Sequence, residues 1–352
     1  MYIWSRCLSR SLSRFLKDPA IAIYEVRPQP STIGGAVNLD PKALRCLSHL
    51  GVLEVLQSRQ SGAPVSQISV FSAHAGYLLG TLDFSNSGDG KGPGFGTPPF
   101  KATRVTRADV LSALLETISR YPNIKLHYSR RATTLTESHS TATVTFADGS
   151  TASADLILGC DGIHSAARCF VDPDRKPTYS GVAVAYGFAK GISDLAFPWQ
   201  DTCLTSSRHG SLLASYYQPD RQNMYVAAVM ETDEIGSREG WEVKGADRQR
   251  VREDIETRLS QNRVPGMTEV MKRTEDWLLY PVYRLPPKGK WCTKRVMLLG
   301  DAAHAVGFLS VPELPLRVSP EWTAKLIRNS RCRRRATPQA WRSKTRSSFA
   351  DF

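Results

Sequence analysis

The sequence has 352 residues, of which 41% are hydrophobic and 9% aromatic, as is ordinary for a globular protein with a sizeable core. This length predicts two domains, or one domain with a large insertion. No stretch approaches the roughly 18 apolar residues that a membrane-spanning helix needs, so we expect no membrane span.

The net charge of +13 is concentrated at the two ends of the chain. Residues 305–352 hold ten Lys or Arg against three Asp or Glu, and residues 1–20 hold four against one. A basic tail without a folded, aromatic-interleaved surface is usually just solvated. We therefore expect no nucleic-acid partner; the alternative is binding through the Arg-rich residues 331–335.

The cysteine pattern indicates a reducing compartment and predicts no metal site. There is no Cys-x-x-Cys pair and no His cluster at metal-ligand spacing. We expect a cytoplasmic protein whose cysteines act as small buried hydrophobes. The alternative location is mitochondrial, because basic residues interleave with Ser and Leu over residues 1–17 as in a targeting peptide. The seven cysteines are Cys7, Cys46, Cys160, Cys169, Cys203, Cys292 and Cys332.

The first half of the chain alternates short strands and helices. Helical spacing over residues 8–17 is followed by a buried strand over 21–25, and Asp40-Pro41 opens a helix that Gly51 closes. Residues 62–76 and 77–84 alternate as strands do. Residues 85–99 are rich in Gly, Ser and Pro, which favours a surface loop over a phosphate-binding loop.

An amphipathic helix is predicted from Arg107 to residue 116, followed by strands over 124–128 and 141–146 and a hairpin turn at Asp148-Gly149. Residues 179–283 differ in kind, since they read as antiparallel strands with one charged helix. The strands are expected over 182–188, 212–217 and 224–230, and the helix over 247–259.

Two distant segments, residues 156–165 and 296–305, share one pattern. Each is an apolar run that ends in a small residue and an aspartate, Asp161 or Asp301, before helix-forming residues. A buried parallel strand that delivers a carboxylate to the carboxyl edge of a sheet has this pattern, and α/β proteins bind nucleotides at that edge.

Glu25 lies where a dinucleotide-binding unit places the acid that holds a ribose hydroxyl, about 20 residues after a Gly-rich turn. That register makes residues 8–17 the crossover helix and puts the glycines near residue 1. The chain reads Met-Tyr-Ile-Trp-Ser-Arg there, so we expect the first strand and the phosphate-binding turn to be missing.

With Glu25, the helix at Arg107 and the two aspartate segments in this order, residues 8–306 resemble the FAD-dependent aromatic hydroxylases. The salicylate-hydroxylase-like monooxygenases, including those of secondary metabolism, are the most similar group. The resemblance implies an α/β fold: an FAD-binding Rossmann-like domain of the glutathione-reductase type with an inserted mixed or antiparallel β-sheet substrate domain. The implied divisions are an FAD-binding domain over 1–178, a substrate domain over 179–290, a return to the FAD-binding domain over 291–312 and a basic, poorly ordered tail over 313–352.

The resemblance also implies roles for individual residues. Glu25 would bind the FAD ribose, Arg107 would contact the phosphate or ribityl region, and Asp301 would bond the ribityl chain. Two alternatives are structural: Arg107 as a solvated first-turn arginine and Asp161 as a helix cap. The complete set of implied cofactor-binding residues is Glu25, Gly35, Ala36, Arg107, Asp161, Gly162, Gly300, Asp301 and Ala302.

The implied activity is hydroxylation of an aromatic or polyketide-like small molecule by FAD, NAD(P)H and O2. The catalytic residues remain unknown; His164 and His304 are read as ordinary helix-start residues. The alternative function is a homologue that keeps the fold but binds FAD weakly or not at all, because the Gly-rich turn is missing and residues 306–315 depart from the family pattern. Candidates for the pocket lining, each also plausible as a core or rim side chain, are Tyr186, His209, Tyr216, Tyr217 and Tyr283.

Overall fold

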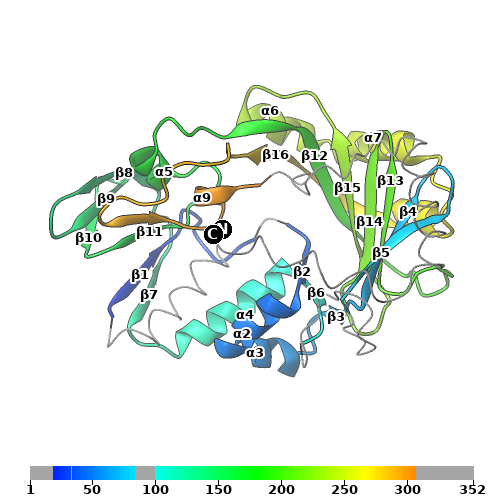
Figure 1. Cartoon of the computed structure of the whole chain (residues 1–352), viewed down its shortest axis with the longest axis horizontal. Helices are drawn as coiled ribbons and strands as arrows, with labels where there is room; N and C mark the ends of the chain where they lie inside the picture. The colour runs from blue at the N-terminus through cyan, green and yellow to red at the C-terminus, as the bar shows by residue number, and fades with distance from the viewer. Residues whose placement is uncertain (1–18, 33, 85–99, 307–352) are drawn as a thin grey trace, which may run out of the picture. The chain divides into compact units, whose positions relative to one another are not determined.

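The computed structural model describes residues 19–32, 34–84 and 100–306. These residues belong to the first of two units, which spans residues 1–310. Figure 1 shows their arrangement as sheets flanked by helices, the mixed α/β fold expected from the sequence. The predictions for residues 8–17, 85–99 and 313–352 lie outside the described residues.

Two pairs of short parallel strands carry the residues expected to bind a nucleotide. Strand β1 (Ile21–Tyr24) pairs with β7 (Ile124–His127), and β11 (Ile157–Gly159) pairs with β17 (Val296–Leu298). The strands predicted at 21–25 and in both aspartate segments are therefore confirmed. Glu25 and both aspartates follow the carboxyl ends of these strands, where a parallel sheet places its ligand site.

A three-stranded antiparallel sheet and helix α5 (Ala166–Val171) pack beside β11 and β17. The sheet comprises β8 (Ala132–Glu137), β9 (Ala142–Phe146) and β10 (Thr151–Ala154). The predicted hairpin turn at Asp148-Gly149 is present, but it joins β9 to β10, a strand that was not predicted. One apolar cluster, with Phe146, Val171 and Leu298 among its members, joins these elements. This cluster fixes the positions of β11 and β17, and therefore of Asp161 and Asp301, which follow them.

A second small sheet, in the order β2-β6-β3, packs on three helices. Its strands are β2 (Ala36–Leu39), β6 (Thr103–Thr106) and β3 (Ala63–Pro64). The helices are α2 (Pro41–His49), α3 (Val52–Ser58) and α4 (Arg107–Ser119). Asp40 and Thr106 cap α2 and α4 through their side-chain oxygens, so the predicted helix starts are confirmed.

The large sheet has seven strands in the order β16-β12-β15-β14-β13-β4-β5. All neighbours are antiparallel except β13 and β4, so the sheet is mixed. The strands are β4 (Gln67–Ser72), β5 (Leu78–Asp83), β12 (Thr178–Ala189), β13 (Thr202–Ser207), β14 (Gly210–Tyr216), β15 (Met224–Glu231) and β16 (Thr274–Arg284).

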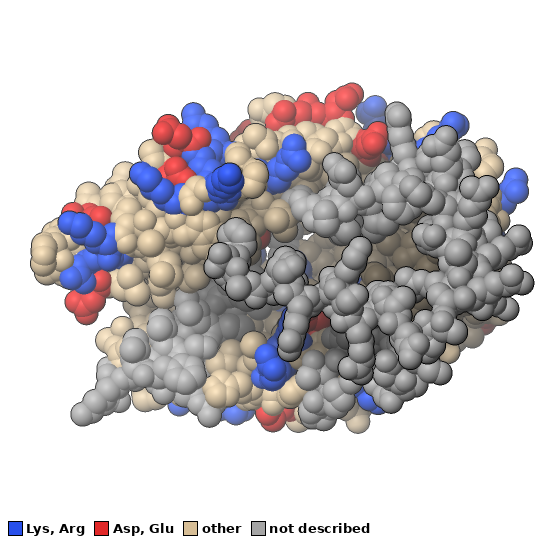
Figure 2. Space-filling model, viewed as in Figure 1, with Lys and Arg blue, Asp and Glu red and all other residues tan. Residues whose placement is uncertain are grey.

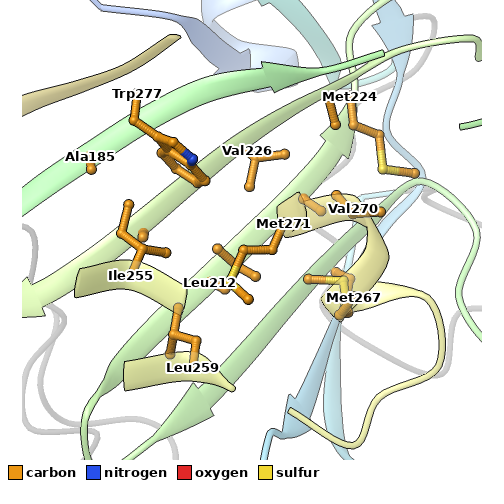
Figure 3. Close-up of a cluster of buried hydrophobic side chains, with 14 of the residues drawn as sticks. Ala185, Leu212, Met224, Val226, Ile255, Leu259, Met267, Val270, Met271 and Trp277 are labelled. Atoms are coloured by element: carbon orange, nitrogen blue, oxygen red, sulfur yellow. The ribbon is translucent and has the colours of Figure 1, made fainter. Parts of the chain in front are cut away.

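Helices α6 (Arg238–Ala246), α7 (Arg248–Leu259) and α8 (Met267–Lys272) cover one face of this sheet. Figure 3 shows Ile255 and Met271 of the helices packed against Leu212 and Trp277 of the strands. The opposite face of the sheet is not covered by these three helices. The charged helix predicted over 247–259 is confirmed as α7.

The sequence boundaries did not anticipate that β4 and β5 belong to the large sheet. They were assigned to the FAD-binding domain over 1–178, but β4 pairs in parallel with β13 from Ile68↔Thr202 to Ser72↔Ser206. This pairing depends on a contact between residues more than 130 positions apart, which local sequence pattern does not encode.

No helix among the described residues is long and apolar enough to cross a membrane. On the face drawn in Figure 2, Lys and Arg side chains lie interspersed with Asp and Glu over the described surface. Such mixing leaves no broad field of one sign on the described part of this face.

Candidate cofactor and substrate site

Two carboxylates at the strand ends differ in how much of their bonding capacity the protein uses. Glu25 is only 6% exposed, and its carboxylate accepts the backbone N–H of Arg27 at 3.1 Å. Asp301 begins α9 (Asp301–His304) and is exposed, and its carboxylate has no hydrogen-bond or ion-pair partner among the residues that the structure describes. Asp301 is therefore available to a ligand, while Ala302 and Ala303 behind it are fully buried.

Asp161, by contrast, is engaged inside the chain. One carboxylate oxygen accepts from the Ser165 hydroxyl and the other from the backbone N–H of Ala167 at 3.1 Å. Ser165 in turn accepts the N–H of Arg168 as the cap of α5. Asp161 thus accepts an N–H in the first turn of α5, whose N-cap is Ser165, and with Gly162 it shapes the loop after β11.

Two buried arginines that sequence reasoning missed hold the aspartate segments together. Arg168 donates to the carbonyls of Ile163 (2.6 Å) and Ala302 (3.4 Å), so it joins the loop after β11 to α9. Arg175 donates to Ala303 (2.8 Å) and to Pro286 (3.0 Å). The carbonyls at the end of α9 have no partners within the helix, and these guanidinium groups satisfy two of them.

The Gly34-Gly35 turn lies between helix α4 and the large sheet. The Arg107 N–H donates to the Gly35 carbonyl (2.9 Å), and the Gly34 N–H donates to the Tyr186 hydroxyl (2.9 Å). A Cβ on Gly34 would lie 2.6 Å from Arg107 Cδ, and one on Gly35 would lie within 3.0 Å of the Tyr225 ring. A side chain at Gly35 is therefore excluded by contact with the tyrosine ring, and one at Gly34 is disfavoured by its φ of +112°.

The face of the large sheet opposite α6, α7 and α8 carries a group of aromatic side chains, here called the aromatic face. Tyr186 stacks on Tyr280 with ring centroids 5.7 Å apart and lies 6.0 Å from Tyr225. Phe188 contacts Tyr217 (5.1 Å) and Tyr225 (5.9 Å). Ala36 of the small sheet packs into the same cluster, so the predicted flavin-side residue and this face are in contact.

Of the five predicted pocket residues, the structure places Tyr186 and Tyr217 on the aromatic face and the other three elsewhere. Tyr216 packs against Phe197 and Trp199 on the helix-covered side, because consecutive strand residues point to opposite faces. His209 is exposed in the turn between β13 and β14, and Tyr283 lies beside His164 and Tyr179 beyond a register shift in β12–β16. Phe188, Tyr225 and Tyr280 were missed.

Burial keeps the phenol groups of the aromatic face protonated. It raises the pKa of Tyr280 to about 12 and also raises the pKa of Tyr225 and of Tyr217, so these phenols are neutral hydrogen-bonding groups at neutral pH. Burial lowers the pKa of Arg104 to about 10, which leaves its guanidinium positively charged at pH 7. It also raises the pKa of Cys160 to about 11, so this thiol is not an activated nucleophile.

These residues fit the cofactor that the sequence led us to expect. Asp301 offers an unpartnered acceptor for sugar hydroxyls, and the Arg107 guanidinium, with no acidic partner among the described residues, offers charge to a phosphate. The Gly34-Gly35 turn brings backbone close to Arg107. The carboxylate of Asp301, the guanidinium of Arg107 and the backbone of the Gly34-Gly35 turn are the kinds of group that bind a dinucleotide.

Comparison with known proteins identifies a family that matches most of the chain. A family described as FAD binding domain matches residues 22–307. The chain is 26% identical over 306 residues to hispidin-3-hydroxylase of Neonothopanus nambi, covering 81% of this chain and 69% of that protein. It is 26% identical over 296 residues to 3-amino-4-hydroxybenzoate 2-monooxygenase of Streptomyces cremeus, covering 84% and 69%.

A solved structure shares the fold. Klebsiella pneumoniae HpxO in complex with FAD and uric acid superposes with a TM-score of 0.68 at 19% identity, covering 87% of this chain and 72% of that one. A similarity at this level of sequence identity establishes the common fold only. The roles of individual site residues must be argued from their chemistry in this chain.

Proposed function

The chain belongs to the FAD binding domain family of flavin-dependent monooxygenases, and from this premise we propose that it hydroxylates an aromatic or polyketide-like small molecule with NAD(P)H and O2. The observation that carries the proposal is the contact between the Gly34-Gly35 turn and the aromatic face. It joins the residues suited to a dinucleotide to a surface suited to an aromatic ring. Hydroxylases and monooxygenases of aromatic compounds among the relatives support the same reaction class.

We assign the cofactor contacts residue by residue. Glu25 and Asp301 would accept hydrogen bonds from FAD hydroxyls, and Arg107 would contact its phosphate or ribityl region. Gly35 with Ala36, and Gly300 with Ala302, would let backbone approach the flavin because none of these positions carries a long side chain. Asp161 and Gly162 would act by shaping the loop after β11.

When bound, FAD supplies the redox chemistry, taking electrons from NAD(P)H and activating O2. The residues of this chain orient the substrate and keep water out. The partly exposed rings of Phe188, Tyr217 and Tyr280 on the aromatic face provide an apolar surface for a substrate ring. The hydroxyl of Tyr280, held neutral, can donate a hydrogen bond to a substrate oxygen without releasing its proton.

Reconstitution with FAD tests this function directly. We expect bound flavin absorbance, NAD(P)H oxidation that an aromatic ligand stimulates, and a hydroxylated product formed with oxygen from O2. Protein that stays colourless after reconstitution would contradict the proposal and favour the alternative of a homologue that keeps the fold but binds FAD weakly. Oxidation of NAD(P)H without product would contradict the hydroxylase assignment alone.

The domain division and the location belong to this proposal too. We assign the cofactor role to the parallel strand pairs and the small sheet, and the substrate role to the large sheet, with β4 and β5 included. Five described cysteines are free thiols, which supports a reducing, cytoplasmic setting, but Cys46, Cys169 and Cys292 are exposed and are not the buried hydrophobes that we expected. Imaging of the tagged protein distinguishes this location from the mitochondrial alternative.

A further inference from the structure

Strand β5 is an edge of the large sheet that presents apolar side chains to solvent. It ends the order β16-β12-β15-β14-β13-β4-β5, and among the described residues it pairs only with β4. All six of its residues are exposed, with Leu78 at 52% and Leu82 at 45%. Leu78 lies across from Phe71 and Leu82 across from Ile68, so the strand is apolar on both faces of the sheet.

This edge lacks the features by which natural sheets block pairing with another chain. Lysine, proline and inward-pointing charges usually protect an edge strand. Residues 76–82 read Gly-Tyr-Leu-Leu-Gly-Thr-Leu and hold neither a charge nor a proline. The opposite edge strand, β16, carries Asp276, Pro281 and Arg284 along its length. The sequence therefore protects one edge of the large sheet and not the other.

Both ends of β5 are fastened to the rest of the sheet. At its start, the hairpin that joins it to β4 is held by the Arg263 N–H, which donates to the Ala73 carbonyl at 2.7 Å. At its end, the Phe84 N–H donates to the Ser66 carbonyl at 2.7 Å. A strand held at both ends loses little conformational freedom when it pairs, and this favours association.

The bond from Phe84 also fixes the direction of the β5 backbone groups. Along an antiparallel strand, the residues turn their N–H and C=O groups alternately to the two sides. The register is regular from Gly80 to the end of the strand, so Gly80 and Leu82 turn these groups toward β4, as Phe84 does. Thr81 therefore turns its N–H and C=O away from β4, toward the open side of the sheet.

A second copy of β5 fits this edge when it runs antiparallel about a two-fold axis at Thr81. The two Thr81 residues then exchange both of their backbone hydrogen bonds and form a favourable threonine pair. In this register Leu82 of each copy lies across from Gly80 of the other, in the closely spaced type of pair. Nothing lies within 4 Å of a Cβ placed on Gly80, so the Leu82 side chain has room there.

We propose that β5 is a homodimer interface, through which two copies of this chain join their large sheets into one continuous sheet. A two-fold interface must be complementary to itself, and the pairing centred on Thr81 meets that condition. Burial of the exposed leucines of both copies supplies the hydrophobic part of the association. The interface uses no residue assigned to the cofactor, so it is independent of the proposed function.

The molar mass in solution tests this interface, with or without FAD. We expect sedimentation of the full chain to give twice the mass of one chain. Leu82→Lys should weaken the dimer about 10- to 100-fold, because it removes apolar contact at two symmetric positions and places a cation on the edge. Val243→Lys is the matched control, since Val243 is 73% exposed on α6, which packs on β16 at the other end of the sheet. It should leave the dimer dissociation constant unchanged.

Thr81→Pro is a second variant that keeps the fold of a single chain. Proline removes an N–H that points away from β4, so it costs no hydrogen bond to β4 but breaks the pairing across the axis. We expect a monomer whose circular dichroism matches that of the natural protein. A natural protein that sediments as a monomer would overturn the interface, whether another segment of this chain or a different protein covers the edge. A dimer that survives both Leu82→Lys and Thr81→Pro would overturn it too, because the copies would then associate through another surface.

Discussion

Arg168 joins two halves of the cofactor region that are far apart in sequence, since its Nη1 donates to the carbonyl of Ala302 across 134 positions. The same guanidinium donates to Ile163 in the loop after β11. Both acceptors lie in the aspartate segments, so one side chain sets the spacing between the loop that Asp161 shapes and the helix that Asp301 begins. The two motifs are held together by an arginine that lies in neither strand.

Arg168→Met tests this link. It leaves buried carbonyls without donors, so we expect the free energy of unfolding to fall by about 3 kcal/mol and FAD affinity to fall with it. Chemical denaturation and flavin titration measure the two effects. Arg238→Met is the control, because Arg238 forms an exposed pair with Glu242 and should change stability by about 1 kcal/mol or less. Equal losses in the two variants would contradict the role of Arg168.

Substitution of the two aspartates should affect different properties of the protein. Asp301→Asn removes charge from a carboxylate without described partners, so we expect weaker FAD binding and unchanged stability of the flavin-free protein. Asp161→Ala removes the acceptor for Ala167 and Ser165, so we expect a stability loss of about 1 kcal/mol. Thermal melting without flavin separates them. A stability loss in Asp301→Asn would show that its carboxylate is structural.

The sequence predicted those parts of the site that depend on local pattern. Short apolar runs ending in Asp161 or Asp301, and capping residues such as Asp40, have the same meaning wherever they occur, and the structure has strands and a helix start there. The roles of these residues in cofactor binding remain predictions. What composition alone could not give is which side of the large sheet faces the cofactor.

Long-range contacts account for what was missed. Tyr216 and Tyr217 were both named as pocket candidates, although successive strand residues point to opposite faces, and only the position of the helices shows which face is covered. Arg104 reads as an ordinary strand arginine until Ser215, 111 residues away, is placed beside it. No strand was predicted over Thr103–Thr106, so nothing in the sequence pattern singled out Arg104.

Gly35→Ala should be costly in spite of its small size. The new Cβ would lie within 3.0 Å of the rings of Tyr225 and Tyr186, so we expect lower stability, by about 1–3 kcal/mol, and weaker FAD binding. Gly80→Ala in β5 is the matched control, because nothing lies within 4 Å of its Cβ position. Gly80→Ala should be neutral or slightly stabilising. If both variants behave alike in denaturation, the turn is not held against the aromatic face as described.

Ionisation of the Tyr280 phenol should lower the free energy of unfolding at high pH. Burial, followed by the neighbouring Tyr186, raises the pKa of Tyr280 to about 12, whereas a phenol in the unfolded chain titrates near 10. The folded state thus holds its proton longer, so this contribution is fully present below about pH 10 and is lost as the pH rises toward 12. Tyr280→Phe cannot ionise, and its stability should fall less over that interval than that of the natural protein.

Denaturant unfolding of both proteins between pH 9 and 12 measures the difference. Tyr179 and Cys203, whose pKa values burial also raises to about 12, are present in both proteins and so cancel in the comparison. Parallel pH profiles for the two proteins would mean that the Tyr280 hydroxyl is solvated. Tyr280 would then be unsuited to stay a neutral hydrogen-bond donor toward a substrate oxygen.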